Sequence, residues 1–413
     1  MVDYSDLKNI PKKDTPFCTL PWVHLATHPI GSVTPCCITE MKNGVSTAAT
    51  ATDDNEHLFL SKDSLEDIAN SKKFNQLRKD MVEGRYSSLC QKCYKYEKGN
   101  SFSKRYESNI KFAKHIEDCF KNTNPDGSLK TIDYKYIELR LGTVCNVKCI
   151  TCNPFSSNRW NQDVKSLKGT EFEKDYFKLD VKNEWYRDLN FYDELYEKCG
   201  LLEEVWINGG EPTLIKEHGY FLEKFINDGR SKNINLHYSL NCTQFPDKFL
   251  ELWSHFKNVK IHLSIDDLEE RNYYIRYPSD WNQIMSSFDK ILKYREIFTL
   301  EVCQTVSALN IFNIDNFKKF TLKHNLTVAH NYVHYPNHMQ VNLIPEHMKK
   351  GILDNVKHLT EHEVQRLKIE LFKPFEEKEV ERFHSFIKIM DKTRNLNIEE
   401  YLPEWKGVIY NNR

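Results

Sequence analysis

Between residues 134 and 333, short apolar runs recur along the chain, and each predicts a β-strand. The six predicted strands are Tyr136–Leu141, Glu204–Asn208, Asn235–Asn241, Val259–Ile265, Thr299–Val306 and Thr327–Val333. The stretches between them place apolar residues at helical spacing. These predicted helices are Phe172–Lys198, Gly219–Asp228, Pro246–Phe256, Trp281–Phe298 and Asp315–His324. Strands that alternate with helices predict a parallel α/β sheet, and six such units suit an open, partial (β/α)6 barrel.

The flanking segments follow different patterns. At the N-terminal side, the sequence predicts a strand over Trp22–Thr27, a turn at Pro29–Gly31, a return strand over Ser32–Thr34 and a helix over Ser64–Glu83. After Val341 the strand signal stops, and two helix-like stretches follow at Leu359–Phe372 and Glu379–Arg394. We therefore expect three parts: a small Cys-rich α+β module with a linker helix over 1–125, the barrel over 126–340, and a C-terminal helical extension over 341–413.

Charge and composition limit the binding partners and the cellular compartment that we expect for the protein. The 413 residues include 58 basic and 59 acidic side chains, and this balance does not suggest a nucleic-acid-binding surface. The first residues are polar, and no apolar run reaches the length of about 18 residues that a membrane span needs. We expect a soluble, cytoplasmic protein that binds neither nucleic acid nor membrane. Disulfides are rare in that compartment, so 12 cysteines point to metal binding.

Three cysteines follow the first predicted barrel strand, in the stretch Cys145-Asn-Val-Lys-Cys149-Ile-Thr-Cys152. Thiolates at this spacing can hold one corner of a [4Fe–4S] cluster, which normally takes four cysteines. Zinc is the alternative, but structural zinc needs a fourth ligand, and no Cys or His lies in the next dozen residues. With three ligands, one iron stays open to a small molecule.

A second group of thiols lies in the N-terminal module. Its expected metal ligands are Cys18, Cys36 or Cys37, Cys90 and Cys93. Four thiolates would close the site, which would then be structural or electron-transferring. Spacing alone does not separate zinc from an auxiliary [4Fe–4S] cluster. We favour Cys36 over Cys37, and the alternative for Cys37 is a buried packing residue.

The CxxxCxxC pattern, followed one βα unit later by Gly209-Gly210-Glu211-Pro212, resembles the radical S-adenosylmethionine (SAM) enzymes. The N-terminal segment resembles the SPASM and twitch auxiliary-cluster modules of those enzymes. The residues that carry this second resemblance are Cys18, Pro29-x-Gly31-x-Val33, Pro35-Cys36-Cys37, Leu77-Arg78, Met81, Gly84 and Cys90-x-x-Cys93-Tyr94. In most of those enzymes the module follows the barrel, whereas here it precedes it. The resemblance covers residues 16–310 and implies a TIM-like barrel with its chemistry at the C-terminal strand ends.

The resemblance also implies a SAM site. Its expected contacts are Gly209, Gly210 and Glu211 for the methionine amino group, Ser239 and Asn241 for the ribose, Ser264 and Asp266 after the fourth strand, Arg276 for the methionine carboxylate, and Val306 against adenine. The family pattern Thr-Asn-Gly is replaced here by Leu240-Asn241-Cys242. Taken alone, Ser239 could be a strand-end cap, Arg276 a surface charge and Val306 a core residue.

The implied activity is that of a radical SAM oxidoreductase. The reduced cluster would cleave SAM to a 5′-deoxyadenosyl radical, which abstracts hydrogen from a substrate. By analogy, the substrate is a peptide or protein that is oxidatively modified, or a small polyol that is dehydrogenated. An electron donor such as flavodoxin or ferredoxin is implied as a partner, and no catalytic residue beyond the cluster ligands is assigned. The alternatives are a non-catalytic iron–sulfur or zinc protein that binds or senses, and a radical methyltransferase.

Several reactive side chains have no motif. Five histidines are candidate active-site groups: His24, His28, His262, His334 and His338. Four cysteines have no partner by spacing and are expected to be structural: Cys119, Cys199, Cys242 and Cys303.

Overall fold

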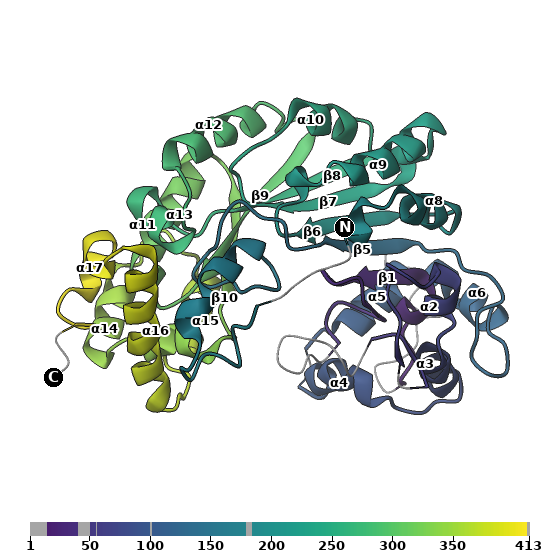
Figure 1. Ribbon diagram of the computed structural model, residues 1–413, viewed down its shortest axis with the longest axis horizontal. Coiled ribbons are helices and arrows are strands. Elements are labelled where there is room, and N and C mark those ends of the chain that lie inside the picture. The colour runs from purple at the N-terminus through teal and green to yellow at the C-terminus, as the bar shows by residue number, and fades with distance from the viewer. Residues whose placement is uncertain (1–14, 40–49, 55, 100, 179–183, 411–413) are drawn as a thin grey trace.

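The computed structural model describes residues 15–39, 50–54, 56–99, 101–178 and 184–410. Its centre is an eight-stranded sheet in the order β10-β9-β8-β7-β6-β5-β1-β2 (Figure 1). Six neighbouring pairs, from β10–β9 to β5–β1, are parallel, and β2 runs antiparallel to β1. The predicted α/β class with a largely parallel sheet is confirmed.

The six strands expected for the α/β region all form, with ends that differ by one residue or not at all. They are β5 (Tyr136–Leu141), β6 (Glu204–Gly209), β7 (Asn235–Leu240), β8 (Asn258–Ser264), β9 (Phe298–Val306) and β10 (Thr327–Tyr332). The helices between them are α7 (Val164–Leu167), α8 (Leu189–Glu197), α9 (Glu217–Asn227), α10 (Asp247–Ser254), α11 (Glu269–Ile275), α12 (Trp281–Leu292) and α13 (Ile314–Lys323). The short helix α11 was not expected from the sequence.

Two long helices expected from periodicity are interrupted. Of Phe172–Lys198, the described residues are helical mainly at α8, and Phe172 and Tyr176 lie on turns because their rings pack against Phe386. The stretch Ser64–Glu83 divides into α2 (Leu65–Ala69) and α3 (Lys72–Val82).

At the division between α2 and α3, Asn70 turns its side chain toward the backbone of Leu129. The amide group of Asn70 donates to the Leu129 carbonyl and accepts from the Leu129 N–H. A side chain that bonds to distant backbone competes with continuation of the helix.

The two faces of the sheet differ in chemistry. Residues such as Ile137, Val205 and Leu236 are fully buried on one face, beneath α8, α9, α10 and α12 (Figure 1). Their neighbours point to the other face, which is polar and half-buried. In register across it lie Glu138, Trp206, His237, Lys260, His262, Glu301 and Cys303. We call this the polar face.

The N-terminal module joins the sheet through a strand. The predicted hairpin forms as β1 (His24–Thr27) and β2 (Val33–Thr34), with Trp22 in the short helix α1 (Leu20–Val23) rather than in the strand. β1 pairs in parallel with β5, with His24 opposite Tyr136 and Ala26 opposite Glu138. The rest of the module is α4 (Gln91–Lys98), α5 (Lys104–Lys111), α6 (Ile116–Lys121) and the small hairpin β3 (Thr52–Asp53) and β4 (Glu56–His57). Its hydrophobic core is continuous with that of the sheet.

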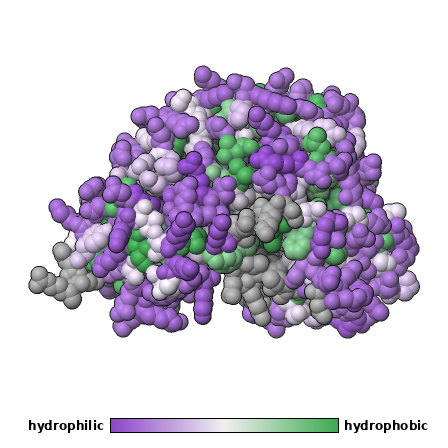
Figure 2. Space-filling model, viewed as in Figure 1, coloured by the Kyte–Doolittle hydropathy of each residue, from purple (hydrophilic) through white to green (hydrophobic). Residues whose placement is uncertain are grey.

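The C-terminal helices lie at the opposite end of the sheet, beyond β10 (Figure 1). They are α14 (Glu346–Asn355), α15 (Glu361–Leu371), α16 (Lys378–Arg394) and α17 (Ile398–Tyr401). A second core cluster joins their apolar residues to Ile150, Trp160 and Val306. The face seen in Figure 2 is mostly hydrophilic, with apolar patches between the helices. Among the described residues, no helix has the length and apolarity to span a membrane.

Arg78 is a buried connection within the N-terminal module. Its side chain is 1% exposed and donates to the carbonyls of Pro21, Ala69 and Gly127. Lysine cannot reproduce this planar set of donors, so Arg78→Lys leaves buried carbonyls unpaired. We expect a loss of about 2–3 kcal/mol in the free energy of unfolding, measured by denaturant titration.

The matched control is Arg85→Lys, because Arg85 is half-exposed and pairs with Asp80 at the surface. A surface pair contributes about 0–1 kcal/mol, so this change should leave stability nearly unaltered. Equal effects of the two substitutions would show that the buried contacts of Arg78 do not stabilise the module.

Candidate metal and cofactor site

The loop that carries Cys145, Cys149 and Cys152 lies at the C-terminal end of β5. Its backbone is bonded on two sides: Lys148 and Ile150 donate to the carbonyls of Tyr277 and Ile275, at 2.6 and 2.7 Å. On the other side, the N–H of Glu211 donates to the carbonyl of Val144 at 2.7 Å. The loop is therefore held between the segments that follow β6 and α11.

The three thiols of this loop lie close enough to interact electrostatically. Burial raises the pKa of Cys149 to about 12 and that of Cys152 to about 11, and burial also raises the pKa of Cys145. Thiols of this kind are protonated at neutral pH unless a metal displaces the proton. Three such thiols on one loop are therefore suited to metal binding and poorly suited to act as free nucleophiles.

The two glycines after β6 permit a close backbone approach. A Cβ atom on Gly210 would overlap the carbonyl group of Val144, and one on Gly209 would lie 2.8 Å from the nitrogen of Leu141. Gly209 also has φ +146°, a conformation that favours glycine. The glycines thus let the end of β6 lie directly against the cysteine loop.

Glu211 and Asn241 belong to one hydrogen-bonded network beside Cys145. The buried carboxylate of Glu211 accepts from the Thr213 hydroxyl at 2.7 Å and from the Asn241 N–H at 2.8 Å. The side chain of Asn241 donates to Asn146 at 2.7 Å and lies 3.9 Å from the Cys145 sulfur. Burial raises the pKa of Glu211. Two predicted cofactor contacts are therefore brought to the cysteine loop, and Thr213 and Asn146 were missed by the sequence analysis.

Asp266 and Arg276 form a buried ion pair, with 2.8 Å between Nη1 and Oδ2. The other oxygen of Asp266 accepts from the Thr305 N–H at 2.8 Å. Burial alone would lower the pKa of Arg276, but the neighbouring Cys149 and Asp266 raise it above its usual value. Arg276 is thus a buried cation beside the cysteine loop, not a surface charge.

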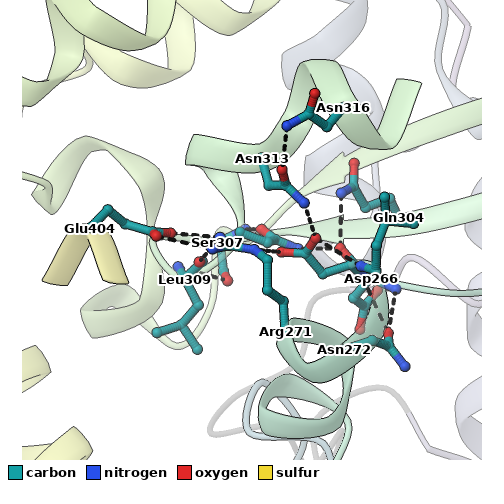
Figure 3. A network of polar contacts seen from close by, with 12 residues as sticks. Asp266, Arg271, Asn272, Gln304, Ser307, Leu309, Asn313, Asn316 and Glu404 are labelled. Carbon is teal, nitrogen blue, oxygen red and sulfur yellow. Dashed lines mark hydrogen bonds and ion pairs between the residues drawn. The ribbon is translucent and has the colours of Figure 1, made fainter. Parts of the chain in front are cut away.

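Figure 3 shows the polar network that holds Asp266 in place. Gln304 and Asn310 both donate to the Asp266 carbonyl at 2.8 Å. Nearby, Arg271 pairs with Asp267 and with Glu404 from the C-terminal segment (Figure 3). No motif in the sequence marks these supporting residues, because they come from four separate segments.

The remaining predicted contacts are placed differently. Ser239 accepts from the Trp206 indole at 3.4 Å on the polar face, and Ser264 lies opposite Cys303 in the register of β8 and β9. Val306 is completely buried in the second core cluster. Cys242, where the family pattern has glycine, adopts φ +63°.

Behind the loop, a row of buried charges connects it to the C-terminal helices. Lys148 pairs with Asp163 at 2.5 Å, and Asp163 pairs with Arg394 of α16 at 2.9 Å. Trp160 donates to the carbonyl of Cys149 at 2.9 Å and lies beneath the Arg394 guanidinium. The sequence predicts a helix over Glu379–Arg394 but does not indicate this role of Arg394, because its partner Asp163 lies 231 residues away.

In the N-terminal module, four thiols line one cavity: Cys18, Cys36, Cys90 and Cys93. Lys104 and Arg105 also line it. Cys37 does not, because its thiol is directed to the carboxylate of Glu138 on β5, and burial raises its pKa to about 12. This placement supports Cys36 over Cys37 as the fourth thiol.

The spacing of the sulfurs bears on the choice of metal. In the part of the chain that the structure describes, one set of three ligand-type atoms lies within 4.8 Å of one another, and it contains none of these seven cysteines. A single zinc ion with bonds of about 2.3 Å would hold its sulfurs about 3.8 Å apart. Among the described residues, no three sulfurs of either group lie that close together.

The histidine candidates are dispersed. His24 stacks on Tyr136, His338 is enclosed by aromatic rings, and His334 is exposed. His28 contacts Thr34 at 3.2 Å within the N-terminal module. His262 lies on the polar face of the sheet.

Comparison with known protein families identifies the N-terminal module. Residues 18–94 match the SPASM family, described as an iron–sulfur cluster-binding domain. The match begins at Cys18 and includes Cys36, Cys90 and Cys93. The match is confined to this segment, and for residues 18–94 it confirms the predicted SPASM-like iron–sulfur module.

Several solved structures are similar to the chain. Native anSMEcpe with bound AdoMet and Cp18Cys peptide is 15% identical over 48% of this chain and 50% of its own, with a TM-score of 0.32. Streptococcus suis SuiB bound to S-adenosylmethionine is 14% identical over 71% and 62%, with a TM-score of 0.35. TYW1 with a lysine-pyruvate adduct is 15% identical over 54% and 74%, with a TM-score of 0.31. The chain thus spans about half the length of anSMEcpe. No curated protein matches it.

Gly210 provides a test of how the site is held together. In Gly210→Ala the new methyl group overlaps the Val144 carbonyl, so the cysteine loop must move away from Glu211. We expect a loss of stability on the order of 2 kcal/mol or more, as for other strained or overpacked positions, together with reduced iron content of the loop. Thermal unfolding and iron analysis measure the two effects.

The control is Gly351→Ala in α14, where a Cβ meets nothing within 4 Å. That change should be neutral or stabilise by up to about 1 kcal/mol, since alanine favours helix. If Gly210→Ala behaves like this control, the loop is not held against the end of β6.

Proposed function

We propose that the protein is a radical SAM enzyme with an auxiliary iron–sulfur cluster. The observation that carries the proposal is the arrangement around the cysteine loop: one buried and two partly buried thiols meet a buried arginine and a buried carboxylate at the C-terminal edge of a parallel sheet. Parallel α/β barrels place their chemistry at that edge. In this proposal β5–β10 with their helices form the partial (β/α)6 barrel.

Cys145, Cys149 and Cys152 would hold the [4Fe–4S] cluster of this site. The thiol of Cys242, which follows β7, is directed to the carbonyl of Leu240 at 3.9 Å, and this supports the view that the loop supplies three protein ligands. When bound, a cluster with one open iron can bind SAM and supply the electron that cleaves its sulfonium.

The side chains around the loop fit the polar end of SAM. Arg276 offers a guanidinium that can pair with the methionine carboxylate, and Asp266 fixes its orientation. Glu211 uses two oxygens for protein donors, yet a carboxylate has further lone pairs for an ammonium group. Ser239 and Ser264 face the sheet's polar side, where the ribose would lie. Val306 is buried, which suits a wall against adenine.

The substrate proposed is a peptide or protein, which the chain would modify oxidatively. Support comes from the SPASM domain and from the polar face, which runs from Lys260 on β8 across His237 and Trp206 to Glu138 on β5, the strand that pairs with the module. The four-cysteine cluster of the module would accept an electron from the substrate or relay one.

The second candidate substrate is a small polyol, which is favoured by the polar, half-buried character of the same face.

Reductive cleavage of SAM is the direct test. Anaerobic protein with dithionite and SAM should release 5′-deoxyadenosine, and Cys149→Ala should abolish the release because the cluster then has two ligands. Cys199→Ala is the matched control, since Cys199 is buried away from both thiol groups. If the protein contains zinc in both sites and no iron or sulfide, the enzyme proposal is wrong and the protein is a non-catalytic binding protein. S-Adenosylhomocysteine as coproduct would indicate a methyltransferase.

Iron counting separates Cys36 from Cys37. The wild-type protein should contain about eight irons, four in each cluster. Cys36→Ala should reduce the count to about four, whereas Cys37→Ala should retain about eight because its thiol points to Glu138. Mössbauer spectroscopy measures both counts. If Cys37→Ala reduces the iron count to about four and Cys36→Ala leaves it at about eight, Cys37 is the cluster ligand and Cys36 is not.

A further inference from the structure

A third group of metal-ligand side chains lies apart from both cysteine groups. It consists of His262 on β8 and Glu301 and Cys303 on β9, whose donor atoms all lie within 4.8 Å of one another. The parallel register puts His262 opposite Glu301, and Cys303 follows two residues later on the same face. All three side chains thus converge on the polar face of the sheet.

The geometry of this group suits one metal ion. His262 Nδ1 lies 3.2 Å from the Cys303 sulfur and 3.2 Å from Glu301 Oε2. A tetrahedral zinc with bonds of about 2.0–2.3 Å holds neighbouring ligand atoms about 3.3–3.8 Å apart. A small outward movement of the side chains would therefore admit the ion. The nitrogen, sulfur and oxygen donor set is typical of zinc.

The surroundings hold the group in place. The ring of His262 stacks on Trp206, with 5.2 Å between ring centroids and 5° between the planes. Trp206 is held in turn by its contact with Ser239. The other ring nitrogen of His262 is buried without a hydrogen-bond partner, although His262 is only 8% exposed. The zinc would bind the other nitrogen, Nδ1, which faces Glu301 and Cys303.

Lys260 is the competitor for this site. Its ammonium group lies 2.8 Å from Glu301 Oε2, the same oxygen that contacts His262. A carboxylate has a second oxygen, so Glu301 can keep Lys260 on one and bind a metal with the other. The lysine charge weakens binding of a divalent cation without excluding it.

We propose that His262, Glu301 and Cys303 bind a zinc ion on the polar face of the sheet. Three protein ligands leave a fourth position, which zinc fills with water or with an oxygen or nitrogen atom of another molecule. That position faces the same side of the sheet as Ser264, which lies opposite Cys303. Cys303 is then a ligand and not a purely structural thiol.

The test is zinc titration of the anaerobic protein with its iron–sulfur clusters in place. We expect one zinc per chain in addition to the iron, with one sulfur among its neighbours in zinc-edge X-ray absorption. Cys303→Ser should remove the sulfur signal, and Glu301→Gln should raise the Kd at least about tenfold. Cys119→Ala, far from the group in the N-terminal module, should leave both readouts unchanged.

Lys260→Gln tests the site without removing a ligand. It removes the competing charge, so the Kd for zinc should fall several-fold. If X-ray absorption shows three or four sulfurs around the zinc, and iron is lost as zinc binds, the zinc lies in the cysteine sites. That result would overturn the proposal. An unchanged Kd in Glu301→Gln and Cys303→Ser, or no binding at micromolar zinc, would also overturn it. If the protein contains no iron but binds zinc through Cys303, the zinc site proposed here is supported, and the proposed radical SAM activity is wrong.

Discussion

The pairing of the cysteine loop with the backbone on both of its sides is the constraint on which the site depends. Hydrogen bonds from Lys148 and Ile150 fix the segment around Arg276, and the bond from Glu211 to Val144 fixes the end of β6. Backbone pairing places side chains more firmly than loop contacts would, because each bond is buried and costly to lose. The guanidinium, the carboxylate and the thiols are thus brought together before any ligand binds.

The same loop requires support from behind, and the buried charges supply it. A carboxylate between two cations, Asp163 between Lys148 and Arg394, is nearly inaccessible to water. Burying charges costs several kcal/mol per ion, and removing one partner leaves an uncompensated charge. The row therefore contributes more to the position of the loop than to net stability. It also couples α16, more than 200 residues away in the chain, to the carbonyl side of Cys149.

Much of this arrangement follows from local sequence pattern, and the rest does not. The strands β5–β10 were predictable because each has apolar residues on one face, and the glycines and cysteines at their ends have fixed spacing. The interruption of the predicted helix near Phe172 was not predictable, because the packing of its ring against Phe386 of α16 outweighs local periodicity. The direction of Cys37 depends on Glu138 of another strand. The group of His262, Glu301 and Cys303 arises only when two strands align in register.

The N-terminal module docks on the sheet by adding a strand to its edge. β1 adds to the free edge of β5, and β2 ends the sheet after two residues. A covered edge protects the sheet from pairing with other chains. The pairing also carries the Cys36–Cys37 turn, which follows β2, toward Glu138, a residue of the polar face. One strand pairing thereby brings the four-thiol cavity of the module and the polar face of the sheet into a single, continuous structure.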